Sequence, residues 1–419
     1  MRISSVTMYE QSSASINRQQ GDLLKIGQQL SSGRKVVNPS DNPQAASQAV
    51  GVSQSMAMSE QYGNSRVSAR TSLAQSESVL NSVSDSITSA KTLLIQASSD
   101  TLSNADRESI ASELKGVYQT LIGQANTADG NGRYLFGGQI DNAPPYVANE
   151  QGAMKYNGSD MVREQRIDSS RNMPVAESGR AIFQKVPSGA GYIGEAVRSD
   201  GVRNAGSVIL SGPQVSDVNG EGYGDDYRIT FGGDTETPTL SVQRLTQDQG
   251  WQPVPDMTDI AYTGGDAPQR LVFGGLSVSL SGASEAADEV NISQAKNAQR
   301  EPDLFKAMEE AIRVLENPAS SDVEKADLRN TLNTSMRDLD NALDNVLTVR
   351  ASAGARLNEL DVIDSIASNR MMSYTQTMSD LVDLDYVEAI SEYSLRQVGM
   401  QASQQTFMNM KGMSLFDYM

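Results

Sequence analysis

The chain of 419 residues contains no cysteine and no histidine. Without cysteine it can form neither a disulfide nor a thiolate metal site, which fits either redox compartment. Without histidine it cannot carry a Ser-His-Asp or Cys-His nucleophilic centre or an imidazole-ligated zinc ion. The metal chemistry that remains is the binding of hard cations by oxygen ligands. Paired carboxylates of the glycosidase type stay open by composition, because Asp and Glu are abundant, but nothing in the sequence singles out a pair. We therefore predict that the protein is not an enzyme, with no catalytic residues, no cofactor and no zinc-type centre.

Basic residues and long apolar runs are also scarce. Lys and Arg number 34 against 52 Asp and Glu, which gives a formal net charge of −18. Such an acidic chain is a poor partner for nucleic acid or for an anionic membrane. No run of about 18 apolar residues could cross a bilayer. The opening MRISSVTMYEQSSASI lacks the apolar region of a cleaved signal peptide, so these features taken alone would suggest a cytoplasmic protein.

Proline is missing from two long stretches, and its distribution divides the chain into three zones. Residues 44–140 and 319–419 contain none and are rich in Ala, Ser, Gln, Leu and Met. Residues 186–290 hold 17 of the 34 glycines and 6 of the 13 prolines. Such compositions are typical of long helices in the outer zones and of strands and turns in the middle. The sequence therefore predicts an α+β fold.

Steps of four and three residues place apolar or small side chains on one face of the outer zones. This heptad spacing predicts long helices that pack along a seam, in a coiled coil or in a helical bundle. After a break near 99–104 the pattern resumes over 110–121. Arg350 and Asp364 interrupt the C-terminal seam, and such polar residues usually set register. The N-terminal seam is Ala69, Leu73, Ser76, Leu80, Val83, Ile87, Ala90, Leu94 and Ala97, and the C-terminal seam runs over 339–381.

Several helix boundaries follow from local chemistry. Ser321 and Glu324 form a capping box. Asn317-Pro318 ends a short helix with an apolar face from Phe305 to Leu315. In the turn 38–43, either Ser40 or Asp41 is expected to cap the next helix, with Pro43 in its first turn. Residues 134–183 alternate in polarity and predict β-hairpins.

Both chain ends carry amphipathic stripes that have no core of their own. Helices of this polarity are marginal in water, so these ends are expected to stay disordered unless they pair with each other or with neighbouring subunits. The predicted assembly interface consists of Ile3, Val6, Ile16, Leu23, Leu384, Val387, Ile390 and Val398.

An acidic segment in the middle zone imitates the start of an EF-hand loop. Gly224 stands where an apolar residue should pin such a loop, and Arg228 stands where a bidentate Glu is needed. An EF-hand is therefore not expected. A looser calcium site stays open as an alternative to an acidic surface turn, and its candidate ligands are Asp217, Glu221, Asp225 and Asp226.

Two further features of the middle zone have ordinary explanations. Gly189, Gly191 and Gly194 match the spacing of a dinucleotide fingerprint, but the βαβ context that the fingerprint needs is missing. We expect a loop in a β-rich domain. The single Trp251 either anchors a small β domain or stacks on a sugar, and the first alternative is favoured.

Two strings of residues resemble a known family. QLSSGRKVVNPSDNP at 29–43 resembles the N-terminal signature that flagellins share with flagellar hook-associated protein 3. NTADGNGRYLFGG at 126–138, followed by Pro144-Pro145, is more similar to the hook-associated family than to flagellin, as is the ending SLFDYM. The opening Arg2-Ile3-Ser4 matches the same family. The motif residues are Leu30, Ser31, Gly33, Pro39, Asp41, Pro43, Tyr134, Leu135, Phe136 and Gly137.

This resemblance covers residues 1–183 and 291–419, and it implies an elongated flagellin-like fold. Long antiparallel terminal helices would form an inner coiled coil from residues 1–43 and 376–419. Residues 44–185 and 291–375 would form a helical bundle with β-hairpins. Residues 186–290 would form a variable, β-rich outer domain.

The resemblance also implies a function. Members of the family form a ring of subunits in the bacterial flagellum, between the first hook-associated junction protein and the flagellin filament. They leave the cell unfolded through the flagellar type III export channel without a cleaved signal, which replaces the cytoplasmic inference, and an export chaperone holds the C-terminal helix. Two alternatives remain: a flagellin filament subunit, and a stalked adhesin with a glycan-binding β domain.

Overall fold

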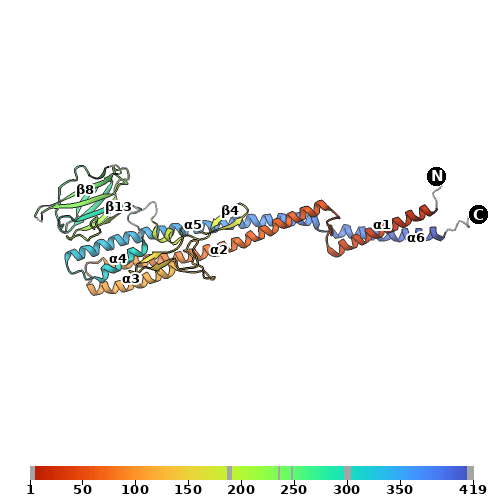
Figure 1. The fold of residues 1–419 in the computed structure, drawn as a ribbon, viewed down its shortest axis with the longest axis horizontal. Coiled ribbons are helices and arrows are strands. Elements are labelled where there is room, and N and C mark those ends of the chain that lie inside the picture. Colours follow the sequence, from red (N-terminus) through yellow and green to blue (C-terminus); the bar gives the residue numbers. More distant parts are fainter. Residues whose placement is uncertain (1–4, 186–190, 235, 247–248, 297–302, 413–419) are drawn as a thin grey trace, which may run out of the picture. The chain divides into compact units, whose positions relative to one another are not determined.

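The computed structural model describes residues 5–185, 191–234, 236–246, 249–296 and 303–412 (Figure 1). The chain divides into two compact units. The first consists of Met1–Arg66, Ile167–Ser169 and Asp361–Met419, and the second of Val67–Arg166 and Ser170–Leu360. Long helices and a β-rich middle region confirm the α+β prediction. The finer three-part division predicted from the sequence stays a prediction.

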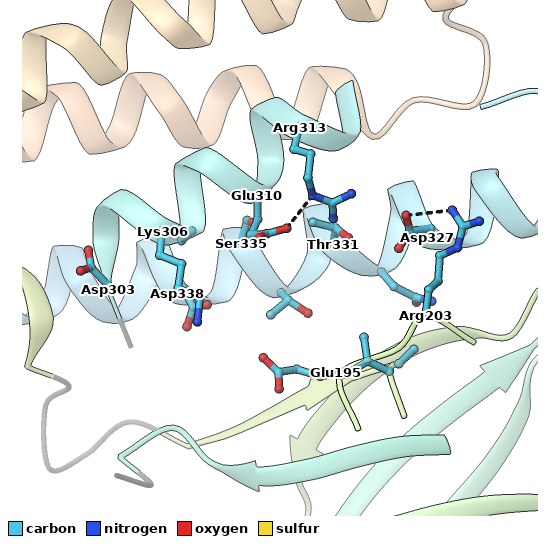
Figure 2. Close-up of a pocket in the computed structure, with 16 residues that line it drawn as sticks. Glu195, Arg203, Asp303, Lys306, Glu310, Arg313, Asp327, Thr331, Ser335 and Asp338 are labelled. Carbon is cyan, nitrogen blue, oxygen red and sulfur yellow. Dashed lines mark hydrogen bonds and ion pairs between the residues drawn. The ribbon is translucent and has the colours of Figure 1, made fainter. Parts of the chain in front are cut away.

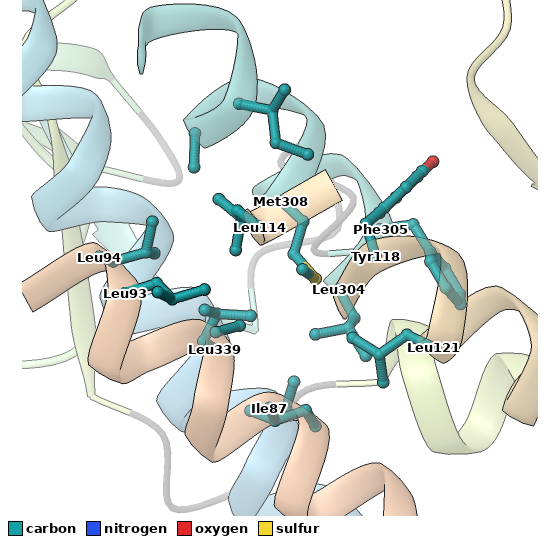
Figure 3. Close-up of a cluster of buried hydrophobic side chains, with 14 of the residues drawn as sticks. Ile87, Leu93, Leu94, Leu114, Tyr118, Leu121, Leu304, Phe305, Met308 and Leu339 are labelled. Carbon is teal, nitrogen blue, oxygen red and sulfur yellow. The ribbon is translucent and has the colours of Figure 1, made fainter. Parts of the chain in front are cut away.

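Four helices surround the first hydrophobic core of the second unit. They are α3 (Asn104–Ala125), α4 (Leu304–Glu316) and parts of α2 (Pro43–Ala97) and α5 (Asp322–Val382). All nine residues of the predicted N-terminal seam are at most 7 % exposed, which confirms the heptad prediction. Figure 3 shows Ile87, Leu114 and Leu339 pointing into this core from three different helices. The predicted break is also present, because α2 ends at Ala97 and α3 begins at Asn104.

The two polar residues of the C-terminal seam meet partners on α2. In the second unit, the guanidinium of Arg350 lies 2.8 Å from the Glu77 carboxylate. In the first unit, Asp364 Oδ1 lies 2.5 Å from Nε of Arg66, which also donates to the Ile167 carbonyl. Arg66 stands one seam step before Ala69. Both seam interruptions are therefore ion pairs between the long helices.

The helix caps confirm one prediction and correct another. The Glu324 N–H donates to Ser321 Oγ at 3.2 Å, and its carboxylate accepts from the Ser321 N–H at 2.8 Å, as the capping box requires. At the start of α2, the prediction of Ser40 or Asp41 as the cap is wrong. Asn42 caps the helix, because its Oδ1 accepts from the Ala45 N–H at 3.0 Å. The Asp41 carboxylate instead closes the preceding turn.

Two antiparallel hairpins lie between α3 and the β-rich region, as predicted for residues 134–183. They pair β1 (Tyr146–Ala148) with β2 (Met154–Tyr156), and β3 (Glu164–Asp168) with β4 (Arg171–Pro174). A short π-helical turn, η1 (Arg180–Gln184), follows them. The ring of Tyr146 packs against Phe183 and Phe305, at centroid distances of 5.6 and 4.7 Å. These aromatic contacts join the first hairpin to α4.

The β-rich region, hereafter the β domain, has its own core. One sheet has the order β10-β8-β7-β13-β5 with β9 paired to β8, and the other has the order β11-β12-β6. In the described part of the chain, its buried side chains and those of the helical core have no member in common. The strands are β5 (Tyr192–Glu195), β6 (Ile209–Val215), β7 (Tyr227–Gly233), β8 (Pro238–Thr246), β9 (Gly250–Pro253), β10 (Ile260–Ala261), β11 (Gln269–Phe273), β12 (Leu276–Ser281) and β13 (Glu289–Gln294).

Candidate assembly interface

The two terminal helices of the first unit contact each other. They are α1 (Ser5–Ser32) and α6 (Tyr386–Gly412). The rings of Tyr9 and Phe407 lie 5.2 Å apart, and Asp22 lies 2.6 Å from the Arg396 guanidinium. Because early residues of α1 meet late residues of α6, the helices run antiparallel. Figure 1 shows the pair side by side.

The turns that lead into this pair bind each other as well. The Lys35 N–H donates to the Val382 carbonyl at 2.7 Å, and the Leu384 N–H donates to the Gly33 carbonyl at 3.1 Å. Gly33 has φ +69°, which suits glycine, and a Cβ there would lie 2.8 Å from the Tyr386 hydroxyl. We call this contact between residues 33–35 and 382–384 the terminal joint.

Asp41 closes the turn that follows residues 33–35, and Asp385 caps the helix that follows residues 382–384. The Asp41 carboxylate accepts from the Asn38 N–H at 2.9 Å and lies 3.1 Å from Lys25 Nζ. The Asn38 amide and the Lys25 ammonium hold the pKa of Asp41 below its ordinary value. Asp385 caps α6 by accepting from the Val387 N–H at 2.9 Å.

The six predicted interface residues whose side chains the structure describes fall into two groups. Ile16, Leu23 and Leu384 are half-buried in the first unit. Val387, Ile390 and Val398 are 78, 54 and 63 % exposed. Ile3 lies outside the described residues, and so does the side chain of Val6. The structure therefore brings the first group toward the helix pair and leaves the second group uncovered by α1.

Helix α6 presents apolar side chains on two opposite faces. With 3.6 residues per turn, Ala389, Tyr393 and Phe407 share the face toward α1, where Ala389 is 5 % exposed. The opposite face carries a set of apolar side chains, each more than half exposed. We call it the outer stripe: Val387, Ile390, Leu395, Val398 and Met408.

The charged groups of α6 lie off the outer stripe or at its edge. Arg396 lies on the α1 side, where it binds both Glu392 and Asp22 at 2.6 Å. Glu388 precedes Leu395 by seven residues, or about two turns, so it lies at the edge of the outer stripe. The rest of the stripe can be covered without desolvating an ion. This arrangement suits packing against another helix.

The sequence analysis did not identify several apolar residues on the two faces of α6. Leu395 and Met408 are 73 and 64 % exposed and were not among the predicted residues. Their helical spacing from Val387 and Val398 was the signal that could have found them. Tyr393 and Phe407 on the α1 side were missed as well, because a helix that is apolar on two faces gives no single stripe.

The family motif residues have different local roles. Within the first unit, Leu30 is half-buried, Ser31 donates to the Gln28 carbonyl at 3.0 Å, Pro39 is exposed, and Pro43 is the first residue of α2. Gly33 belongs to the terminal joint, and Asp41 closes the turn over residues 37–41.

The second motif is an anchor within the second unit. Leu135 and Phe136 are 3 and 1 % exposed, and the Tyr134 N–H donates to the Asp141 carbonyl at 2.8 Å. Gly137 has no room for a side chain, because a Cβ would lie 2.1 Å from the Ile140 carbonyl oxygen. The motif therefore holds the loop before the first hairpin against the core.

Two of the acidic middle-zone candidates lie beside a cation. Asp225 and Glu221 lie 3.6 and 4.0 Å from the Arg244 guanidinium. Across the described residues, no group of three or more Asp and Glu is placed to hold a metal ion. Gly194 lies inside β5, with no helix opening on it, and Gly189 falls outside the described residues.

Trp251 lies in β9 on the face of the sheet that carries Arg228. The Arg228 guanidinium lies 4.2 Å from the centre of its ring. One face of the ring is thus occupied by a cation from within the domain. This contact favours an anchoring role for Trp251 over sugar stacking.

Comparison with known proteins assigns the chain to a family. The family model described as "Bacterial flagellin N-terminal helical region" matches residues 3–141, so the chain has a flagellin-like N-terminal part. The chain is 32 % identical to flagellar hook-associated protein 3 of Escherichia coli (strain K12), over 99 % of both chains. It belongs to the family of flagellar hook-associated protein 3.

Two solved structures from Legionella pneumophila support this assignment. The crystal structure of flagellar hook-associated protein 3 is 27 % identical, with a TM-score of 0.67, over 79 % of this chain and 98 % of that one. The flagellar junction protein FlgL is 26 % identical, with a TM-score of 0.64, over 80 and 100 %. The chain is thus a structural flagellar component. No helix in the described ranges is long and apolar enough to cross a membrane.

Proposed function

We propose that the protein is the subunit that joins the hook-associated ring to the flagellin filament, with no enzymatic role, and that it assembles through its terminal helices. The outer stripe of α6 carries the assembly step of this proposal. A helix whose inner face is occupied by α1 and whose outer face exposes Val387, Leu395 and Val398 requires a second partner to bury both faces.

The energetics favour such a partner. Full burial of one large apolar side chain yields about 1.5–3 kcal/mol relative to exposure. The outer stripe offers five such side chains, each more than half exposed. Their combined burial in a polymer would exceed the cost of ordering one helix end, whereas a lone subunit leaves them in water. We propose further copies in the ring, the first hook-associated junction protein and flagellin as the partners.

The route to this position is part of the proposal. An unfolded chain must pass a narrow export channel, and this chain has no cysteine that could lock it by a disulfide. The protein would reach the extracellular hook–filament junction by flagellar type III export without a cleaved signal. A chaperone on α6 would cover the outer stripe before export, because the stripe exposes five large apolar side chains of that helix.

A pair of variants tests the outer stripe in a strain that lacks the native protein. Leu395→Asp together with Val398→Asp would place two charges in the proposed contact, and we expect loss of filament attachment while the variant is still exported. The matched control Gln404→Asp adds a charge to an exposed position of α6 off the stripe. Electron microscopy of filaments and immunoblots of the medium give the two readouts. Normal filaments on the double variant would refute the role of the stripe.

A further inference from the structure

The β domain is attached to helix α5 by polar side chains. Asn330 Oδ1 accepts from the Leu210 N–H at 2.9 Å, and its Nδ2 donates to the Val208 carbonyl at 2.8 Å. One turn further along α5, Asn333 donates to the Leu210 carbonyl at 3.3 Å, and Thr334 donates to the Gly194 carbonyl at 3.1 Å. We call Asn330, Asn333 and Thr334 the clasp.

The clasp binds the edge of a sheet. Strand β6 is the outer strand of the order β11-β12-β6, so its second side lacks a neighbouring strand in that sheet. The amide of Asn330 offers one donor and one acceptor, as the backbone of a further strand would. Side chains of helix α5 therefore hydrogen-bond the backbone groups at the edge of β6, which the main chain of a further strand would otherwise bind.

Two cavities flank the clasp. One has a volume of about 660 Å³ and lies between α4, α5 and the start of the β domain (Figure 2). The other, of about 460 Å³, lies on the side of Ile193 and Lys91. Asn330 and Thr334 line both. Water in cavities of this size has access to the clasp from two sides and competes for its hydrogen bonds.

The first cavity is lined by charged groups rather than by a packed apolar contact. Figure 2 shows Arg203 of the β-domain side paired with Asp327 of α5, and Arg313 paired with Glu310. The Arg203 to Asp327 distance is 3.5 Å, and the Arg203 side chain is half exposed. An exposed ion pair of this kind adds little attachment.

We propose that the clasp is a releasable attachment, so that the β domain leaves α5 as a folded body without unfolding of either core. Separate cores make this possible, because breaking the clasp and the Arg203–Asp327 pair disrupts neither set of buried side chains. Water replaces each lost hydrogen bond, since the clasp lies between the two cavities. Release would also expose the β6 edge to other chains.

Hydrogen exchange in the native full-length chain tests the release of the β domain, and one substitution extends the test. The Leu210 amide is protected by Asn330, so it should exchange by release of the domain, faster than the Val242 amide, which bonds to Met257 within the β core. Asn333→Ala leaves the acceptor of Leu210 intact but weakens the clasp. It should speed exchange at Leu210 about fivefold. Equal rates at Leu210 and Val242 would overturn the proposal.

A distance measurement gives an independent test. Because the chain has no cysteine, Glu113→Cys on α3 and Val272→Cys on β11 place two spin labels at exposed positions. Asn330→Ala should move part of the population to new distances while circular dichroism stays unchanged. Asn358→Ala, an exposed position of the same helix, is the matched control and should leave the distribution unchanged. A distribution unaltered by Asn330→Ala would overturn the proposal.

Discussion

At the scale of single residues, a few positions carry constraints that composition does not reveal. Gly33 needs a positive φ and close approach to Tyr386, whereas Gly21 lies inside α1, where an added methyl group would meet nothing within 4 Å. The buried Asp288 carboxylate is satisfied by the N–H groups of Ala205, Gly206 and Glu285. These roles depend on backbone conformation and on distant partners, so no sequence pattern could have assigned them.

Gly33→Ala is expected to weaken the terminal joint by about 1–2 kcal/mol, because alanine is strained at positive φ and its Cβ would meet the Tyr386 hydroxyl. Faster amide exchange over residues 33–40 and 382–388 would measure the effect. Gly21→Ala is the matched control and should stabilise α1 by about 0.5–1 kcal/mol. Equal effects of both substitutions would show that the joint imposes no constraint on Gly33.

The Asp168 carboxylate of the first unit gives a pH-dependent prediction. Hydrogen bonds from Arg370, which lies 2.9 Å away, hold the pKa of Asp168 below its ordinary value. The pKa of Asp168 is thus lower in the folded than in the unfolded chain. The contribution of the Asp168–Arg370 pair to folding stability is therefore complete above about pH 4 and is lost as the pH falls through the folded-state pKa. On acid titration, the Asp168→Asn variant should lose less stability than the native chain over that range. If both chains lose the same amount, Arg370 does not depress the pKa of Asp168.

At the scale of elements, helices with a regular apolar repeat were predicted correctly from the sequence, whereas features with two possible readings were not. The seam over 69–97 was found because its small and apolar residues repeat without exception, and all are buried. The cap of α2 was missed because Asp41 and Asn42 are both good capping residues, and the turn decides between them. The outer stripe was only partly found, since α6 is apolar on two faces. Sheet order in the β domain depends on non-local pairing that no local pattern specifies.

Asp364→Asn is expected to destabilise the pairing of the long helices by about 1–3 kcal/mol, because it removes the negative charge that is paired with the buried Arg66 guanidinium. Glu77→Gln removes the partner of Arg350 at a more exposed site and should cost about 0–1 kcal/mol. Chemical denaturation followed by circular dichroism would compare the two. A larger loss for Glu77→Gln would reverse the proposed ranking.

At the scale of the whole chain, the two sets of buried side chains behave as separate cores. Because they have no described residue in common, replacing residues 192–294 by a short flexible linker should leave the helical core folded. The expected result is a cooperative helical transition within about 5 °C of the native one, since the shortened chain loses the clasp and little else. Thermal unfolding at 222 nm would measure it. Loss of cooperative unfolding would show that the cores depend on each other.

The ion pairs between α2 and α5 have a consequence for helix register. A slip of one helix past the other by seven residues would keep apolar groups facing each other, but it would separate Arg66 from Asp364 in the first unit and Arg350 from Glu77 in the second. Each pair therefore selects, within its own unit, one register out of the several that the apolar repeat alone would allow.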